Sequence, residues 1–171
     1  HALKHFEIAL ENNPKNTRAF QEKLFVLHEM GKNDEVGRTH IKPEFQDDEG
    51  VLQQKTYALF EVAKYDEALD YSNKTLEIKK SVPNYVWKGW ILAKLDRYEE
   101  AKKCYDEAIR LDKKWKYPWN NKGNALSNLG QNKKAIECYD EAIRLDKKWK
   151  YPLCNKGDVL ETKLRQHKKA K

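Results

Sequence analysis

The sequence predicts an all-α protein built from stacked antiparallel helix pairs, and three observations indicate this fold class. The fifteen-residue segment CYDEAIRLDKKWKYP occurs at Cys104–Pro118 and again at Cys138–Pro152, an offset of 34 residues. Apolar residues recur about one helical turn apart within each copy. Charged residues make up 36% of the chain, yet 11% of its residues are aromatic, which indicates a folded protein with a thin core. Identical segments at a fixed offset must meet the same surroundings twice, as they do in a stack of repeats.

The unit at residues 116–149 shows the helix pair most clearly. The apolar residues of Asn120–Leu129 lie about one turn apart, and Gly130 follows as a helix-ending residue. Asn132–Leu145 is a second predicted helix, whose stripe contains Ala135, Ile136, Tyr139, Ala142 and Ile143. Because the link between them is short, we expect the two helices to lie antiparallel. Pro118 suits the first turn of the first helix, where no backbone donor is needed.

Gly123 lies inside the first predicted helix of this unit, where glycine is otherwise unfavourable. We expect it to face Ala135 or Ala142, because close approach of two helices leaves no room for a side chain. Tyr139 is then expected to fill the gap beside them. Neither helix buries its apolar stripe alone, so successive units are expected to stack.

The neighbouring units have similar residues at the equivalent positions of the 34-residue repeat. These positions hold Trp119, Gly123, Leu126, Ala135, Tyr139 and Ala142 in one unit, Tyr85, Gly89, Leu92, Ala101, Tyr105 and Ala108 in the preceding unit, and Leu153, Gly157, Leu160 and Ala170 in the last. This pattern resembles the tetratricopeptide repeat. The resemblance implies a right-handed α-solenoid, in which residues 1–171 form a single array of helix pairs.

The repeat boundaries follow from the same slots. Residues 1–16 match the second helix of a partial repeat, 17–48 a degenerate repeat, 49–81, 82–115 and 116–149 three repeats, and 150–171 a partial repeat. In the degenerate unit Leu24 takes the glycine slot, and Gly37 and Pro43 interrupt the second helix. We therefore expect a short helix there and a loop through roughly Pro43–Glu49.

No residue pattern indicates catalysis, a metal site or a bound cofactor. The five histidines are scattered, and none belongs to a recognisable metal-binding motif. Cys104 and Cys138 occupy the same repeat slot, so they are copies of one small packing residue. We therefore expect a protein that is not an enzyme and that has no catalytic residue.

The resemblance implies a concave surface lined by repeat positions 2, 5, 9 and 12 of the first helices. We expect this groove to bind a peptide segment of a protein partner, with apolar anchors flanked by amides. The residues expected to carry it are Gln21, Phe25, Gln53, Tyr57, Phe60, Val86, Trp90, Asn120, Asn124 and Asp158. Part of the family grips a terminal carboxylate with lysine, asparagine and arginine, but Asn120 stands in the lysine slot, so we expect no such clamp.

Two alternative functions remain open. Residues 82–171 carry 22 Lys+Arg against 12 Asp+Glu, so the basic half could bind nucleic acid or another polyanion. Its turn clusters contain Lys113, Lys114, Lys116, Lys147, Lys148 and Lys150. The accompanying Trp115 and Trp149 are otherwise expected to cover the junction between repeats. The other alternative is a scaffold arm of a multidomain enzyme, or an element that self-associates through its terminal helices.

The sequence also bears on the cellular compartment of the protein. Three cysteines form no pattern typical of a disulfide framework, which favours a reducing, cytoplasmic compartment. No apolar run is long enough to insert across a membrane, and no signal-peptide pattern stands at the start. The chain opens at His1 within a helical pattern, which indicates a piece of a longer protein.

Overall fold

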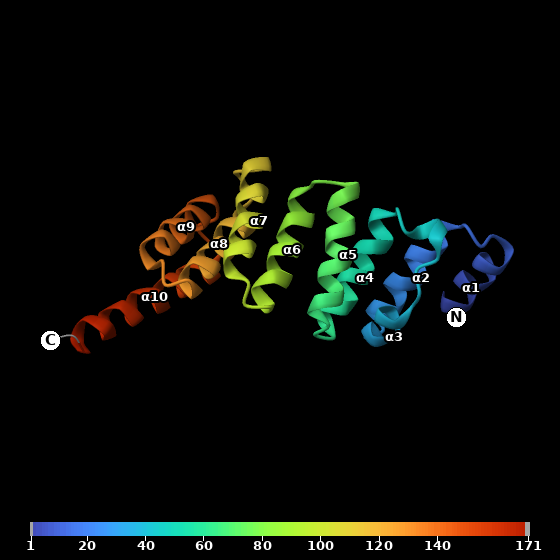
Figure 1. Cartoon of the computed structure of the whole chain (residues 1–171), viewed down its shortest axis with the longest axis horizontal. Helices are drawn as coiled ribbons and strands as arrows, with labels where there is room; N and C mark the ends of the chain where they lie inside the picture. Colours follow the sequence, from blue (N-terminus) through green and yellow to red (C-terminus); the bar gives the residue numbers. More distant parts are fainter. Residues whose placement is uncertain (1, 170–171) are drawn as a thin grey trace. The chain divides into compact units, whose positions relative to one another are not determined.

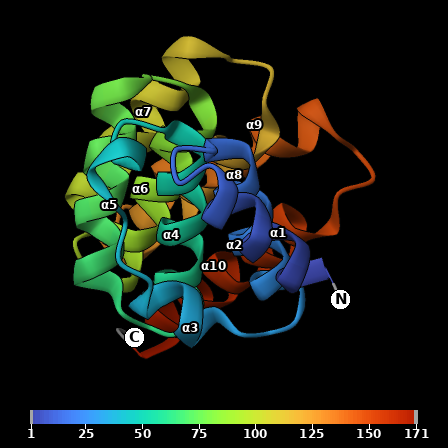
Figure 2. The ribbon, with the colours of Figure 1, turned by 90° about the vertical axis from the view of Figure 1, so that its right-hand side faces the viewer.

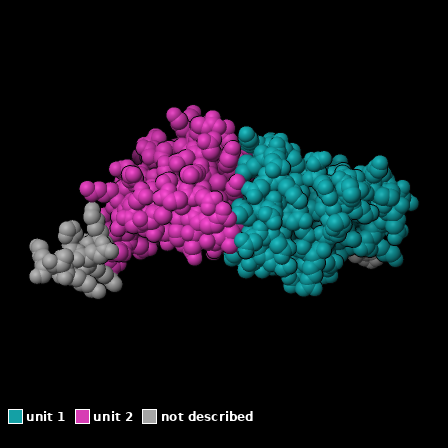
Figure 3. Space-filling model, viewed as in Figure 1, with its two compact units in different colours: residues 1–80 teal, residues 81–171 magenta. Residues whose placement is uncertain are grey.

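The computed structural model describes residues 2–169, with side chains for residues 2–162. Residues 2–169 form ten α-helices, one turn of 3-10 helix and no strand (Figure 1), which confirms the predicted all-α fold. The elements are α1 (Ala2–Asn12), α2 (Thr17–Glu29), α3 (Asn33–Arg38), η1 (Pro43–Phe45), α4 (Glu49–Glu61), α5 (Tyr65–Ile78), α6 (Val82–Lys94), α7 (Tyr98–Leu111), α8 (Lys116–Asn128), α9 (Asn132–Leu145) and α10 (Lys150–Lys169). The chain divides into two compact units, residues 1–80 and residues 81–171 (Figure 3).

Unit 1, residues 1–80, packs each helix against its neighbours in chain order. α1 contacts α2, as Figure 2 shows, while α4 contacts both α3 and α5. The two first helices of their pairs, α2 and α4, also contact each other. The core of this unit contains Leu24, Leu27, Val36, Val51 and Leu52, all at most 1% exposed. The apolar stripes predicted from the sequence are therefore buried between the helices.

The degenerate second helix of unit 1 is short, as its sequence predicts. α3 ends at Arg38, and the chain stays non-helical until α4 except for the single turn of η1. The loop thus begins earlier than the predicted Pro43. Phe45 replaces the missing helical turns in the core, because it is fully buried and stacks on Phe20 with the ring centroids 4.5 Å apart.

Unit 2, residues 81–171, repeats one packing scheme twice. α6 pairs with α7 and α8 pairs with α9, and each second helix also contacts the first helix that follows it. The first helices α6, α8 and α10 contact one another in sequence. Tyr105 and Tyr139 are the largest side chains of the core, each 1% exposed.

The helix glycines of unit 2 face tyrosine rings, and the expectation that Gly123 faces Ala135 or Ala142 is wrong. A methyl group on Gly123 would meet the ring of Tyr139, with Cδ1 at 2.7 Å. A methyl group on Gly89 would likewise meet the ring of Tyr105, with Cζ at 2.7 Å. Each glycine therefore accommodates the aromatic ring of its own partner helix, and the ring itself occupies the space next to the backbone.

Four first helices end in the same motif. The residue after the cap has a positive φ in each case, namely 71° at Gly31, 58° at Ala63, 57° at Asp96 and 71° at Gly130. At the last of these, Gly130 N donates to Ser127 O at 2.9 Å and the next backbone N–H, that of Gln131, donates to Leu126 O at 2.8 Å. This is the hydrogen-bond pattern of a Schellman cap. Gly130 thus ends its helix as predicted, and two non-glycine residues adopt the same strained conformation.

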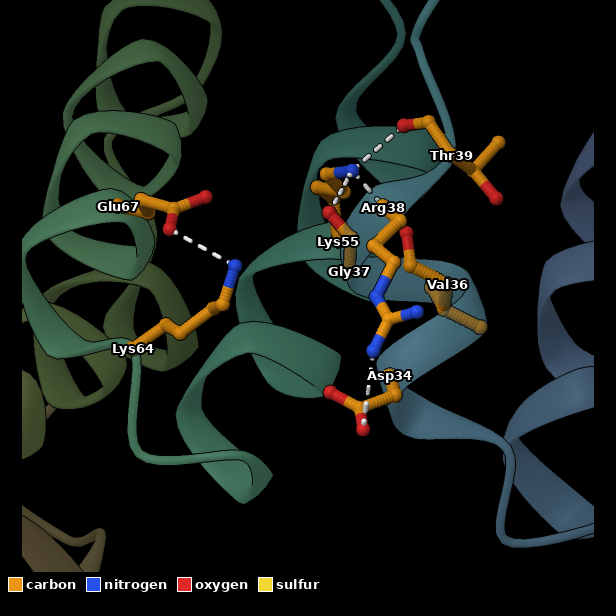
Figure 4. A network of polar contacts seen from close by, with 8 residues as sticks. All are labelled: Asp34, Val36, Gly37, Arg38, Thr39, Lys55, Lys64 and Glu67. Carbon is orange, nitrogen blue, oxygen red and sulfur yellow. Dashed lines mark hydrogen bonds and ion pairs between the residues drawn. The ribbon is translucent and has the colours of Figure 1, made fainter.

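Lys55 closes the end of the short helix α3. Its side chain is only 3% exposed, and its ammonium group donates to the backbone oxygens of Val36 at 3.0 Å, Gly37 at 2.5 Å and Thr39 at 2.5 Å (Figure 4). The last carbonyl groups of a helix lack the usual partner one turn further on, and the lysine bonds to those of Gly37 and Thr39. It adds a second hydrogen bond to Val36 O, which also accepts from the backbone N–H of Thr39. Burial lowers the pKa of Lys55 to about 8, and the charge of Glu67 opposes this shift.

Lysines at the same repeat position act similarly in unit 2. Lys122 Nζ of α8 pairs with Asp106 Oδ1 of α7, and Lys156 Nζ of α10 pairs with Asp140 Oδ1 of α9, both at 2.6 Å. In each unit, therefore, this lysine of a first helix binds the preceding second helix. In unit 1 that helix ends early, so Lys55 binds its backbone instead.

Candidate functional site

A hollow of about 270 Å³ lies between α2 and α4 in unit 1. It is lined by Gln21, Glu22, Phe25, Gly50, Gln53 and Gln54. Three of the predicted groove residues, Gln21, Phe25 and Gln53, are thus brought together. The ring of Phe25 is 45% exposed, so it offers an apolar surface surrounded by amides.

Carboxylates orient two of these amides. Gln21 Nε2 donates to Asp48 Oδ1 at 2.5 Å, and Gln53 Nε2 donates to Glu49 Oε1 at 3.1 Å. Asp48 also caps α4 by accepting from the backbone N–H of Val51. The start of α4 therefore holds the lining of the hollow in place.

Tyr57 and Phe60, which the sequence also assigned to the groove, do not line this hollow. Tyr57 packs edge-on against His28 with ring centroids 4.4 Å apart, and Phe60 packs against Tyr65 at 5.5 Å. Burial, aided by the charge of Glu61, raises the pKa of the Tyr57 phenol. Both rings are half-buried in contacts within unit 1.

A second hollow, of about 510 Å³, lies in unit 2 between α8, α9 and α10. Its lining residues are Asn124, Ser127, Asn128, Gly130, Asn132, Tyr139, Asn155, Asp158, Val159 and Thr162. The predicted groove residues Asn124 and Asp158 therefore share one site. Tyr139 Oη and Asn155 Nδ2 both donate to Asn124 Oδ1 at 2.9 Å, and Asn155 Nδ2 also donates to Asn120 Oδ1 at 3.0 Å.

Three predicted groove residues lie elsewhere in unit 2. Asn120 is 6% exposed and Val86 is 4% exposed, so neither presents a surface to a ligand, contrary to expectation. Asn120 is covered because its oxygen binds Asn155 on the neighbouring helix. Trp90 is 37% exposed and packs edge-on against Trp87, with ring centroids 5.0 Å apart.

Repeat position 6 supplies lining residues that the sequence analysis missed. Glu22 and Gln54 line the hollow of unit 1, and Asn155 lines that of unit 2. Each occupies the position directly after predicted position 5. A signal was present, because Gln54, Asn121 and Asn155 repeat an amide side chain at this position.

The lysine clusters of the duplicated turns are partly used inside the fold. Lys116 Nζ pairs with Asp146 Oδ2 at 2.5 Å and lies 5.3 Å from the ring centroid of Tyr117 and 5.0 Å from that of Trp149. The ring centroids of Tyr117 and Trp149 are themselves 5.0 Å apart, and the ring planes are inclined at 65° to each other. The hydrogen bond from Lys116 holds the pKa of the Asp146 carboxyl below its usual value. These contacts join successive repeats.

The other five lysines of the clusters are exposed at the turns or the helix start: Lys113, Lys114, Lys147, Lys148 and Lys150. Binding of a polyanion would rest on these five, since Lys116 is engaged with an aspartate and two rings. Those rings take the lysine on their faces, which disfavours stacking of bases on them.

The cysteines behave as packing residues where the repeat predicts it. Cys104 and Cys138 are buried, and burial raises the pKa of each thiol to about 11. Cys154 is exposed. Among the residues that the structure describes, no group of three or more histidine, cysteine, aspartate or glutamate side chains could hold a metal ion. The described helices also include none that is long and apolar enough to span a bilayer.

Comparison with known families gives this architecture a name. Family models described as "Tetratricopeptide repeat" match residues 82–114 and residues 117–148. These two segments belong to the tetratricopeptide repeat family. Tetratricopeptide repeats generally mediate protein–protein interactions, and proteins of this family are typically non-enzymatic scaffolds.

Solved structures share the fold at low sequence identity. YrrB, described as a TPR protein with an unusual peptide-binding site, is 16% identical, with a TM-score of 0.73 over 92% of this chain and 83% of its own. MamA is 13% identical, with a TM-score of 0.75 over 85% of this chain and 87% of its own. The second TPR domain of human RPAP3, solved with the HSP70 peptide SGPTIEEVD, is 19% identical, with a TM-score of 0.62 over 69% and 98%. No curated protein matches the chain.

Proposed function

We propose that this tetratricopeptide repeat protein binds an extended peptide segment of a protein partner on the exposed faces of its first helices. The observation that carries this proposal is that the hollow between α2 and α4 contains predicted stripe residues from both helices. The hollow of unit 2 similarly contains Asn124 and Asp158 from two first helices. Residues chosen for a repeat position thus come together in space.

The chemistry of the unit 1 hollow suits a polypeptide. An exposed aromatic ring, Phe25, gives an apolar anchor of the kind that dominates binding energy in many interfaces. Glutamine amides from α2 and α4 surround it, and amides pair with both the N–H and C=O groups of an extended backbone. Binding through the backbone supplies affinity, while the ring selects an apolar side chain of the partner.

The structural relatives support the proposal in general terms. YrrB and the RPAP3 domain are both described with peptide binding. The ligand of the RPAP3 domain ends in acidic residues, whereas this chain has Asn120, a buried amide, where a clamp for a terminal carboxylate would need lysine. The proposed ligand is therefore a different class of peptide.

The test compares two exposed apolar residues of unit 1. A random library of acetylated and amidated nonapeptides is passed over the immobilised chain, and the bound fraction is measured for the wild type, Phe25→Ala and Ile8→Ala. Ile8 is 44% exposed, close to Phe25 at 45%, but does not line the hollow. Loss of the aromatic anchor should weaken binding at this hollow about tenfold, so that the bound fraction falls to what the unit 2 hollow retains, while Ile8→Ala should leave it unchanged. Equal binding by all three proteins would refute the proposal for this hollow.

A further inference from the structure

Hydrogen bonds determine how the asparagine side chains of the unit 2 hollow are turned. The oxygen of Asn124 accepts two hydrogen bonds, from Tyr139 Oη and Asn155 Nδ2, both at 2.9 Å. The nitrogen of Asn155 donates two, the second going to Asn120 Oδ1 at 3.0 Å. A carbonyl oxygen has two lone pairs and an amide nitrogen has two protons, so both atoms are fully used.

Tyr139 makes this orientation independent of pH in the neutral range. Burial, with smaller effects from Cys138 and Asp158, raises the pKa of its phenol. The hydroxyl group therefore stays protonated and is able to donate to Asn124 Oδ1 at neutral pH.

The remaining polar atoms of the two asparagines are the nitrogen of Asn124 and the oxygen of Asn155. Neither has a hydrogen-bond partner in the part of the chain that the structure describes. One donor and one acceptor, held on the adjacent helices α8 and α10, complement the C=O and N–H groups of a peptide backbone. The arrangement favours the inside of an extended segment over its charged end.

The charge of the hollow points the same way. Asp158 is the one charged residue among the described residues that line it. Residues 82–171 carry 22 Lys+Arg against 12 Asp+Glu, so a hollow without a basic side chain is a local exception in this unit. A carboxylate of a ligand would meet Asp158 with no cation in the lining, whereas an arginine or lysine would pair with it.

We infer that the unit 2 hollow binds an internal stretch of a partner polypeptide, with a backbone peptide group on Asn124 and Asn155 and an arginine or lysine side chain beside Asp158. This inference rests on the proposed function and names the class of peptide that this hollow takes. It separates the site from one that recognises an acidic chain terminus.

The experiment uses three libraries of acetylated and amidated nonapeptides with random flanking residues. The central residue is arginine in the first, citrulline in the second and glutamate in the third; citrulline keeps the shape of arginine without its charge. The bound fraction is measured on the whole chain, and the side-chain amide NMR signals of Asn124 and Asn155 report contact with the hollow. An ion pair at a partly exposed site contributes modestly, so the arginine library should bind about fivefold better than the citrulline library. Glutamate should bind least.

Asp158→Asn should make the arginine and citrulline libraries equal, while the control Asp106→Asn should keep the preference, because Asp106 pairs with Lys122 and lies outside this hollow. The inference is overturned if the glutamate library binds as well as the arginine library, if Asp158→Asn does not change the preference, or if the NMR signals of the two asparagines do not move. Each of these results leaves peptide binding at the unit 1 hollow, which depends on Phe25, unaffected. If no library binds either hollow, the proposed function itself fails.

Discussion

The glycine–tyrosine contacts of unit 2 allow a sharp test of the packing. Gly123 and Gly89 face the buried rings of Tyr139 and Tyr105, whereas a methyl group on Gly157, in the same repeat slot of α10, would meet no described atom within 4 Å. The three substitutions Gly123→Ala, Gly89→Ala and Gly157→Ala are therefore chemically identical but differ in what the new methyl group contacts.

The expected magnitudes follow from two opposing effects. Alanine is favoured over glycine inside a helix by about 1 kcal/mol. At Gly123 the methyl group would overlap a ring that is 1% exposed and has no room to move, and overpacking of this kind costs about 3 kcal/mol. Gly123→Ala and Gly89→Ala should thus lower the free energy of unfolding by about 2 kcal/mol. Gly157→Ala should leave it unchanged or raise it by up to about 1 kcal/mol.

Thermal unfolding followed by circular dichroism measures these differences. For a chain of this size, about 2 kcal/mol corresponds to a Tm lower by roughly 4 to 8 °C. The double variant Gly123→Ala/Tyr139→Leu should show favourable coupling, because removing the ring removes the overlap. If all three alanine variants shift Tm in the same direction and by the same amount, the rings do not occupy the glycine slots and the packing described above is wrong.

Three further predictions concern other features of the fold. The pKa of Lys55 falls from 10.5 to about 8 on folding, so the unfolded chain binds more protons than the folded chain between these pH values. Relative to Lys55→Met, the free energy of unfolding of the wild type should therefore rise by about 3 kcal/mol from pH 8 to 10.5. The same pH dependence of unfolding in both proteins would contradict this. Ala63→Gly should raise Tm, since it relieves a φ of 58° at about 1 kcal/mol, and an unchanged or lower Tm would count against strain there. A thiol reagent should modify Cys154 in the native protein and reach Cys104 and Cys138 only in denaturant, as mass spectrometry of labelled peptides would show.

Much of the helical architecture could be predicted because it depends on local patterns. The apolar stripe of Asn132–Leu145 and the helix end at Gly130 need no knowledge of the neighbouring chain, and both are found in the structure. The partner of Gly123 was predicted wrongly because the spacing of alanine and tyrosine on one stripe leaves open which side chain approaches the glycine most closely.

Features set by a neighbouring backbone could not be predicted. Lys55 has the same repeat position as Lys122, and its burial depends on α3 ending at Arg38, where backbone carbonyl groups of the last turn lie within reach. Similarly, Asn120 occupies a predicted groove position but is covered, because Asn155 of the next first helix binds its oxygen.

The candidate site was predicted in part for the same reason. Helical spacing alone places Gln21, Phe25 and Gln53 on facing stripes, and these residues share a hollow. Helical spacing does not show whether the residue next to a predicted groove position is also exposed on the same side of its helix. The lining residues Gln54 and Asn155, at repeat position 6, were therefore missed.

The central claim, that peptides bind on the faces of the first helices, is tested most directly by a crystal structure of the chain with a peptide selected from the random library. The account predicts electron density for the peptide against Phe25 between α2 and α4, or against Asn124 and Asn155 between α8 and α10. A peptide bound only to the second helices α5, α7 or α9, with both hollows empty, would contradict it.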